Sequence, residues 1–329
     1  MKALFYLRKK LNTKDILQNV NFSGNIVSLL ASTTEIICAL GLKNNLVGIS
    51  HECDNPKEIL NLPIVSSPNI DTKASSKEID SSVMHALSNN SSIYNINNEL
   101  LKSLKPDFIF LQDHCNVCAI SPEDLEIFFQ DITNKNCKII RFSPNTIDEM
   151  ISGIYNIGKE LDCENNAHII INNLKNKLRS YKNKNLKLTK KYNVAFIEWI
   201  EPLFYGGNWI PEIIEYAGAK SIFGNIGEHS TTIGFEKIKQ NNPDFILISP
   251  CGFDIKKTLS ELNPLINHPD WKTLKAVKNN KIFILDGNKY FNRSGLSIIP
   301  SIEIIKEIIY TKNSVYNFEN SCWVNLNNI

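Results

Sequence analysis

Short apolar runs alternate with amphipathic stretches along most of the chain. The first run, Ile26–Leu30, ends in small polar residues and is typical of a buried strand. In the stretch that follows, Ser32 and Glu35 have the spacing of a helix capping box, and Gly41 can end that helix. The turn between them would present hydroxyl groups and backbone N–H groups at the carboxyl end of the strand, where open α/β sheets bind ligands.

The same alternation continues to residue 310. Further strands are predicted at Leu46–Ser50, Ile64–Ser66, Asp107–Gln112, Lys138–Phe142, Tyr192–Trp199, Phe245–Ser249 and Lys281–Asp286. Helices are predicted at Asn97–Leu104, Pro122–Thr133, Pro211–Ala217, Ile255–Glu261 and Pro300–Tyr310. Strands that alternate with helices favour an α/β fold with central parallel sheets covered by helices.

A chain of 329 residues is expected to form two lobes, because one hydrophobic core rarely organises so many residues. A helical pattern without proline extends over residues 146–182 and is longer than an ordinary domain helix, so we interpret it as one helix that connects the lobes. The expected organisation is an N-terminal extension (1–24), an N-terminal α/β lobe (25–145), the connecting helix (146–182), a C-terminal α/β lobe (190–311) and a loosely ordered tail (312–329).

Two segments of the chain resemble each other. Residues 100–115 read LLKSLKPDFIFLQDHC, and residues 235–251 read FEKIKQNNPDFILISPC. In both, a helix leads into a Pro-Asp pair, an apolar strand and a turn with a cysteine. As an internal repeat, they would place Cys115 and Cys251 at equivalent strand ends of two similar lobes, facing each other across a cleft.

Polar, aromatic and thiol side chains follow the predicted strands, which are themselves almost purely apolar; a ligand cleft requires this partition. Trp209 and Tyr290 lie in loops rich in Gly and Asn, where a large ring has little reason to lie unless it covers something, either a ligand or, as a lid, the protein itself. Planar ligands of the corrin or porphyrin kind stack on such rings. Arg293 could bind a carboxylate, phosphate or amide-rich edge, or form a surface ion pair.

Two histidines and three cysteines form a set of soft metal ligands: His51, Cys53, His114, Cys115 and Cys118. The Cys-x-x-Cys pair lets two thiolates reach one metal ion. Three interpretations stay open: a metal site, including ligation of a metal-bearing ligand; a dithiol redox pair; and small residues that shape a turn. We interpret Cys38, Cys137 and Cys163 as small buried or half-buried residues.

Charge and motifs exclude several classes of function. The formal net charge of +2 gives no reason to expect a nucleic-acid partner. The G-x-S-x-G, G-x-G-x-x-G and P-loop fingerprints are absent. The apolar run Ala3–Leu7 is cut off by Arg8 and is shorter than the core of a secretory signal, so we expect a cytoplasmic protein.

Several segments then resemble one known family. NIVSLLASTTEIICALGLKNNLVGISHECDNP (residues 25–56) resembles the opening of the class III substrate-binding proteins of ABC importers, which bind vitamin B12 and iron-siderophores, and in particular their cobalamin-binding branch. QDHCNVCAIS (112–121), GNWIPEIIEYAGA (207–219), PCGFDIKKT (250–258) and GNKYFNRSG (287–295) resemble the same branch, in order.

This resemblance implies two Rossmann-like lobes joined by one helix, with a corrinoid or another metal chelate in the cleft between them. With the positions that follow the strands, it suggests twelve ligand contacts: Ser32, His51, Glu52, Trp199, Asn208, Trp209, His229, Ser230, Phe253, Tyr290, Asn292 and Arg293. As metal ligands it suggests His51, Cys53, His114, Cys115, Cys118 and Cys251.

We therefore expect a monomer that binds a corrinoid or related metal chelate, either as an ABC-importer substrate-binding protein or as a cytosolic relative. Zinc or iron stays open as a bound metal. An ABC permease would be the partner if the chain is exported, and a periplasmic location would follow from a misassigned start site. The alternative is a cytosolic metal- or thiol-dependent enzyme, with Cys115 or Cys118 as nucleophile or ligand.

Overall fold

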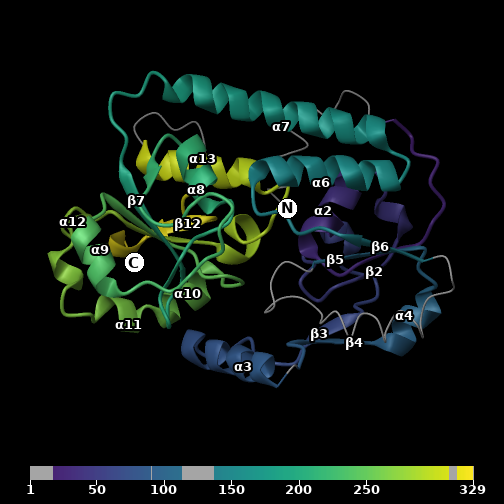
Figure 1. Ribbon diagram of the computed structural model, residues 1–329, viewed down its shortest axis with the longest axis horizontal. Coiled ribbons are helices and arrows are strands. Elements are labelled where there is room, and N and C mark those ends of the chain that lie inside the picture. The colour runs from purple at the N-terminus through teal and green to yellow at the C-terminus, as the bar shows by residue number, and fades with distance from the viewer. Residues whose placement is uncertain (1–17, 90, 113–136, 311–316, 329) are drawn as a thin grey trace. The chain divides into compact units, whose positions relative to one another are not determined.

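Two α/β units make up the computed structural model, which describes residues 18–89, 91–112, 137–310 and 317–328 (Figure 1). The first unit comprises residues 1–74, 78–144 and 148–173, and the second comprises residues 75–77, 145–147 and 174–329. In the part of the chain that the structure describes, no helix combines the length and apolar composition that crossing a bilayer requires.

A parallel sheet forms the centre of the first unit, in the order β2-β1-β5-β6 among the described residues. Its strands are β1 (Ile26–Ser28), β2 (Leu46–Ile49), β5 (Phe108–Leu111) and β6 (Lys138–Arg141). The helices that accompany them are α2 (Ala31–Ala39), α3 (Ser76–Ser88), α4 (Asn98–Leu104) and α6 (Ile147–Glu160). Val27, Val65, Leu101 and Ile109 are fully buried on one side of this sheet.

The sheet of the second unit has the order β12-β11-β10-β7-β8, with β9 also paired to β7. Its strands are β7 (Asn193–Trp199), β8 (Phe204–Tyr205), β9 (Lys220–Ser221), β10 (Phe245–Ile248), β11 (Ile282–Leu285) and β12 (Trp323–Asn325). β7, β10 and β11 are parallel to one another, and their buried residues face a core that includes Trp271 and Leu274.

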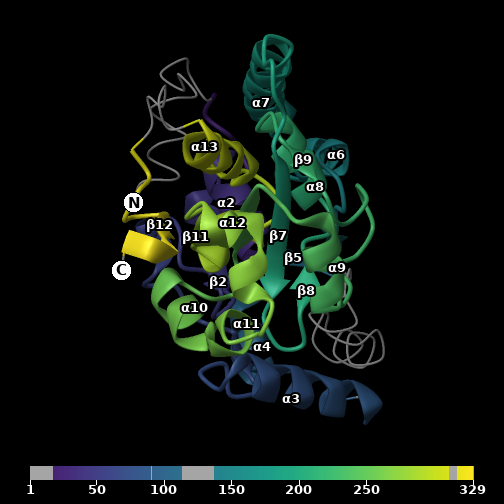
Figure 2. The ribbon, with the colours of Figure 1, turned by 90° about the vertical axis from the view of Figure 1, so that its left-hand side faces the viewer.

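Helices cover this second sheet. They are α8 (Ile210–Tyr216), α9 (Phe235–Asn241), α10 (Ile255–Glu261), α11 (Asn263–Ile266), α12 (Lys275–Lys278) and α13 (Ile298–Ile309). Figures 1 and 2 show α8 and α13 near each other, and Tyr310, just after α13, donates a hydrogen bond to the carbonyl of Gly218, just after α8, at 2.9 Å. The predicted α/β fold with central parallel sheets is confirmed.

A helix does connect the two units, whose boundary falls between residues 173 and 174, but residues 146–182 do not form it as one helix. The stretch forms two helices, α6 and α7 (Glu164–Asn185), because Asp162 adopts a left-handed conformation with φ +51°. Beyond this break α7 packs on α6, and a Cβ atom at Gly158 would lie only 2.4 Å from the Cβ of Ala167. A helical pattern alone does not reveal the break, since the residues on both sides continue the periodicity.

Three further expectations need correction. α2 begins at Ala31, and its cap residue Leu30 makes no side-chain capping bond, so Ser32 and Glu35 do not form the capping box. The tail contains strand β12, which pairs antiparallel with β11. Of the strand expected at residues 64–66, Ile64 forms a parallel bridge with Ile49 at the edge of the central sheet, whereas Ser66 begins β3 (Ser66–Pro68), which pairs outside that sheet with β4 (Tyr94–Ile96). The predicted helix 122–133 lies outside the described residues.

Candidate functional site

In the second unit, the carboxyl ends of three neighbouring parallel strands bring distant loops together. The loop after β10 is joined to the end of β7 by a hydrogen bond from the backbone N–H of Cys251 to the carbonyl of Glu198, at 3.1 Å. The loop after β11 is joined to the loop after β10 by the N–H of Gly287, which donates to the carbonyl of Phe253 at 2.9 Å. The end of β7 and these two loops carry six of the predicted site residues: Trp199, Cys251, Phe253, Tyr290, Asn292 and Arg293.

An aromatic pair lies at this edge. The rings of Trp199 and Phe253 are 5.1 Å apart at 50°, and Lys257 from α10 places its Nζ 5.2 Å from the centre of the Phe253 ring. Phe253 is buried, whereas Trp199 is partly exposed. Trp199 therefore presents an aromatic edge that a flat ligand can cover, backed by a second ring and a cation.

The indole of Trp199 is held in position by the first residues of α3, which belong to this unit. Its Nε1–H donates to the carbonyl of Ser76 at 3.2 Å, and the N–H of Ser76 donates to Glu261 Oε2 at 2.8 Å. Burial by itself raises the pKa of Glu261, but hydrogen bonds from Lys257 and from Ser76 outweigh it and lower that pKa. The carboxylate of Glu261 is thus charged and fixed beside the aromatic pair.

A hydroxyl group meets the carboxylate of Glu198, the residue before Trp199 in β7. Ser230 Oγ donates to Glu198 Oε1 at 2.8 Å and accepts from the backbone N–H of Gly207 at 3.0 Å. Gly207 has no room for a side chain, because a Cβ atom there would lie 2.4 Å from the nitrogen of Ser230. Asn208 has φ +50° in the same loop, and His229 is exposed beside Ser230.

Two rings that were expected to face a ligand lie in the interior of the second unit. Trp209 is 8% exposed, and its Nε1–H donates to the carbonyl of Phe291 at 2.9 Å. Tyr290 is 6% exposed, and its hydroxyl accepts from the thiol of Cys322 at 3.3 Å. Both rings therefore have partners within the protein that the loop composition did not reveal.

Arg293 is also buried, at 7% exposure, and not at the surface. Its Nη2 donates to Asn288 Oδ1 at 3.2 Å, and its charge favours the ionised form of buried Asp286. Burial nevertheless raises the pKa of Asp286 overall, against the effect of Lys289, whose Nζ is 3.3 Å from Asp286 Oδ2. Asn292 donates to the carbonyl of Gly287 at 2.8 Å and closes the same loop.

In the first unit, the ends of β1 and β2 are neighbours and meet in a buried network of hydroxyl groups. Ser28 Oγ lies 2.8 Å from the hydroxyl oxygens of both Thr33 and Thr34. The Sγ of Cys53 lies 3.1 Å from Thr34 Oγ1 and is buried, as is Ser32. The hydroxyl groups of the strand–helix turn thus point largely inward, and Cys53 stabilises the turn.

His51, at the end of β2, lies at the surface of this network. Its Nδ1 is 2.8 Å from Ser66 Oγ, and its ring is 5.3 Å from that of Tyr94. Ser66 donates its hydroxyl proton to Ser50 at 3.0 Å, so it accepts from His51, and the hydrogen of a neutral ring lies on Nδ1. Nε2 then carries the lone pair; it is buried, has no hydrogen bond among the described residues and lies 3.3 Å from the carboxylate of the exposed Glu52 side chain.

The predicted six-ligand metal site is only partly visible. His114, Cys115 and Cys118 lie outside the described residues, and with them the expected pairing of Cys115 with Cys251 across a cleft. Among the residues that are described, no group of three or more His, Cys, Asp or Glu side chains could hold a metal ion. Cys251 is exposed and Cys53 is buried.

Sequence reasoning overlooked Ser66, Tyr94, Ser76, Lys257 and Glu261 as neighbours of the candidate residues. Ser66 and Tyr94 come from the β3–β4 pair, and Ser76 begins a helix that the hydropathy pattern did not predict. Glu198 could have been found from the sequence, since it is a carboxylate near the end of an otherwise apolar strand, directly before Trp199.

The chain is similar to three known proteins. It is 24% identical, over 87% of its length and 79% of the relative's, to an uncharacterised ABC transporter substrate-binding lipoprotein of Bacillus subtilis (strain 168). Its fold matches the periplasmic vitamin B12 binding protein BtuF of Vibrio cholerae (TM-score 0.61, 19% identity, 88% of this chain and 97% of that one). It also matches S. aureus IsdE complexed with heme (TM-score 0.66, 17% identity, 88% and 99%).

The expectation of a cytoplasmic protein is wrong. The matched relative is a lipoprotein, and the matched B12-binding structure is periplasmic. The expectation depended on the short apolar run within residues 3–7, a local criterion that carries no information about the rest of the chain.

One family covers both sheets. The periplasmic binding protein family matches residues 26–288, a span that begins at β1 of the first unit and continues past β11 of the second. Within it lie the Trp199–Phe253 pair, the Ser230–Glu198 contact and His51. The chain belongs to the periplasmic binding protein family.

Proposed function

We propose that this chain is the substrate-binding protein of an ABC importer for a metal chelate of the corrinoid type. The observation that carries the proposal is the environment of His51. A histidine that donates from Nδ1 to a fixed oxygen keeps its Nε2 lone pair for a metal, as metal-ligating histidines do. Nε2 of His51 is buried in this structure, with the Glu52 carboxylate 3.3 Å away, so a ligand reaches it only when Glu52 moves. His51 is thus suited to bind the open axial position of a chelated metal.

Glu52 is the group that the metal would replace. Its carboxylate is 3.3 Å from His51 Nε2, and its side chain is 46% exposed, so it can turn toward solvent at little cost. A neutral imidazole facing a carboxylate without a hydrogen bond is unfavourable, and a metal centre at Nε2 removes that conflict. Bare zinc or iron lacks the further ligands it would need among the described residues.

The aromatic pair of the second unit supports the same class of ligand. Trp199, supported by the buried ring of Phe253, offers ring surface to a flat macrocycle, and Glu198 and Ser230 offer polar atoms for its amide or carboxyl substituents. The named ligands of the matched structures, vitamin B12 and heme, are both metal-bearing macrocycles. An ABC permease is the partner that this function requires.

The experiment is a titration of metal-free protein with cyanocobalamin, hemin and a ferric siderophore, followed by visible spectra and thermal unfolding. Saturating corrinoid at 100 times its Kd should stabilise the fold by about 2.7 kcal/mol. His51→Ala should abolish the spectral change, whereas His85→Ala, at an exposed site on α3, should preserve it. If hemin alone stabilises the protein, the ligand is a porphyrin and not a corrinoid. If none of the chelates has an effect, the proposal is refuted.

A further inference from the structure

A strongly basic segment lies outside the candidate site. Between Glu164 and Glu198 the sequence contains no acidic residue, although the whole chain has 36 basic and 34 acidic residues. Eight basic residues fall within 17 positions: Lys175, Lys177, Arg179, Lys182, Lys184, Lys187, Lys190 and Lys191. The proposed chelate binding uses none of them.

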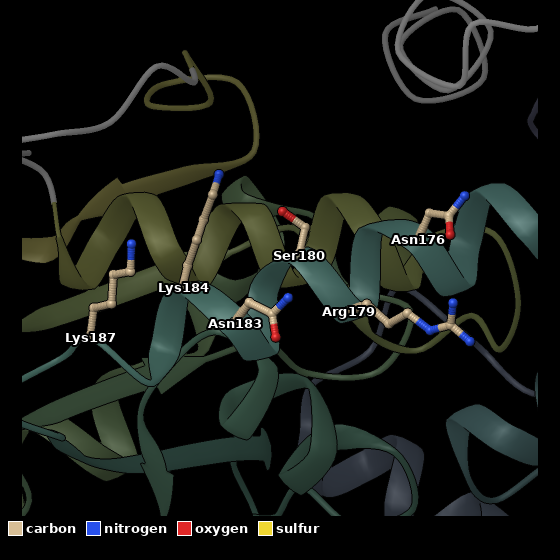
Figure 3. A pocket seen from close by; sticks show the side chains of 6 residues that line it. All are labelled: Asn176, Arg179, Ser180, Asn183, Lys184 and Lys187. Atoms are coloured by element: carbon tan, nitrogen blue, oxygen red, sulfur yellow. The ribbon is translucent and has the colours of Figure 1, made fainter.

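The structure places Arg179 and Lys184 on the outer face of α7, and Lys187 follows just after the end of this helix. Leu174, Leu178 and Tyr181 of this helix are buried, so the opposite face points to solvent. On that face, residues four apart form two rows that line an open hollow of about 370 Å³ (Figure 3). The rows are Asn176, Ser180 and Lys184, and Arg179, Asn183 and Lys187.

These cations are not neutralised by the protein. Arg179, Lys184 and Lys187 are exposed and form no ion pair with any carboxylate among the described residues. Lys184 also repels another cation: burial lowers the pKa of Lys306, and the charge of Lys184 lowers it further. The surface therefore favours an anionic partner from outside.

An apolar side chain lies within the same surface. Leu186 follows the last residue of α7 and is 85% exposed, more than any other large apolar side chain that the structure describes. It lies in the sequence between Lys184 and Lys187. A leucine this exposed between cations distinguishes the surface from an ordinary solvated helix face.

We propose that the basic α7 surface, defined as Arg179, Lys184, Leu186 and Lys187, docks on an anionic phospholipid bilayer. Cationic side chains meet lipid phosphates while an adjacent apolar side chain enters the interface, and the two contributions add. A single-stranded nucleic acid would instead need exposed rings to stack on, but Tyr181 is buried and Tyr192 lies against Lys190.

The test uses the full chain and vesicles of phosphatidylglycerol mixed with phosphatidylcholine, compared with phosphatidylcholine alone. The protein should sediment with the anionic vesicles only. The triple variant Arg179→Gln, Lys184→Gln, Lys187→Gln should bind on the order of 100-fold more weakly. A control with the same change in net charge, Lys43→Gln, Lys57→Gln, Lys237→Gln, should bind within about threefold of the native chain, because these lysines lie elsewhere on the surface.

The variant Leu186→Ser distinguishes insertion of this side chain into the bilayer from electrostatic attraction alone. It should weaken binding to anionic vesicles several-fold while leaving the net charge and the dependence on salt unchanged. Equal binding to neutral vesicles, or an equal loss in both triple variants, would overturn the proposal. So would complete competition by soluble glycerol phosphate, or binding to an oligonucleotide without binding to vesicles. Chelate affinity, measured in parallel, should not change in any of these variants.

Discussion

Asp244 accepts a hydrogen bond from the backbone N–H of Asn193 at 2.9 Å, and so joins the residue before β10 to the first residue of β7. Asp107 makes the equivalent bond to the N–H of Asn25 at 2.7 Å, between the chain entering β5 and the residue before β1. In both cases a proline precedes the aspartate, and a left-handed residue ends the preceding helix. The repeat seen in the sequence is therefore one structural feature used in each unit.

Asp244→Asn should destabilise the protein and alter its response to acid. Burial raises the pKa of Asp244, but hydrogen bonds from Lys275 and Asn193 outweigh it and lower that pKa. A carboxyl group with a lowered pKa stabilises the fold above its ordinary value near 3.8 and loses that contribution as pH falls through the lowered value. The variant should lose about 1–2 kcal/mol of unfolding free energy at pH 7 and less at pH 3.

Urea unfolding at the two pH values measures this difference. Asp107→Asn is the matched control: Asp107 makes the same backbone bond and has no ion pair among the described residues, so its loss at pH 7 should be smaller. An Asp244→Asn protein as stable as the native chain at pH 7 would contradict the assignment.

Glu307→Ala should be among the more destabilising single changes in the second unit. This carboxylate is 4% exposed, and its Oε1 accepts from the N–H groups of Phe318 and Glu319 and from Trp323 Nε1, at 2.9, 3.1 and 2.9 Å. Removal of the acceptor leaves these three donors without their acceptor, which should lower the free energy of unfolding by about 2–4 kcal/mol. Denaturant unfolding should show this loss, with Glu307→Gln closer to native because it keeps one acceptor oxygen; similar losses for both would argue against the hydrogen bonds.

Trp199→Ala should weaken chelate binding by about 10- to 100-fold, because it removes the partly exposed ring of the aromatic pair. Trp199→Phe should lose much less, since it keeps a ring on Phe253 and gives up only the hydrogen bond to Ser76. Calorimetric titration with the chelate that binds measures the affinity of both variants. As a control, Tyr155→Ala removes an exposed ring from α6 and should leave the affinity unchanged. If Tyr155→Ala weakens binding as much as Trp199→Ala does, the loss does not depend on the ring of Trp199.

The cysteines should differ in their rates of alkylation. Burial, assisted by Asp107, raises the pKa of Cys137 to about 11, and burial with Glu164 and Asp162 raises that of Cys163 to about 12. A raised pKa leaves the thiol protonated at pH 8, and only the thiolate reacts. Peptide mass spectrometry after iodoacetamide treatment at pH 8 should find exposed Cys251 modified well before these two. Modification of Cys163 at a comparable rate would contradict its burial.

The fold was largely predictable because α/β units are encoded by local patterns. The strands at Phe245–Ile248 and Ile282–Leu285 are short, fully apolar runs, and a run of this kind indicates a strand buried on both faces. The helix Ile255–Glu261 was predicted with the bounds that the structure has. The strand at Trp323–Asn325 was not predicted, since it depends on pairing with the distant β11. The break at Asp162 was not predicted either, since the helical pattern continues on both sides of it.

By itself, the sequence determined which loops follow strand ends, and therefore which residues gather at the carboxyl edge of each sheet. It did not determine which of them face outward. Trp209 finds its partner 82 residues away, and His51 finds Ser66 15 residues away. A polar atom is satisfied by whatever the fold brings within 3 Å, so only the tertiary structure decided that Trp209 and Arg293 are buried while Trp199 stays partly exposed.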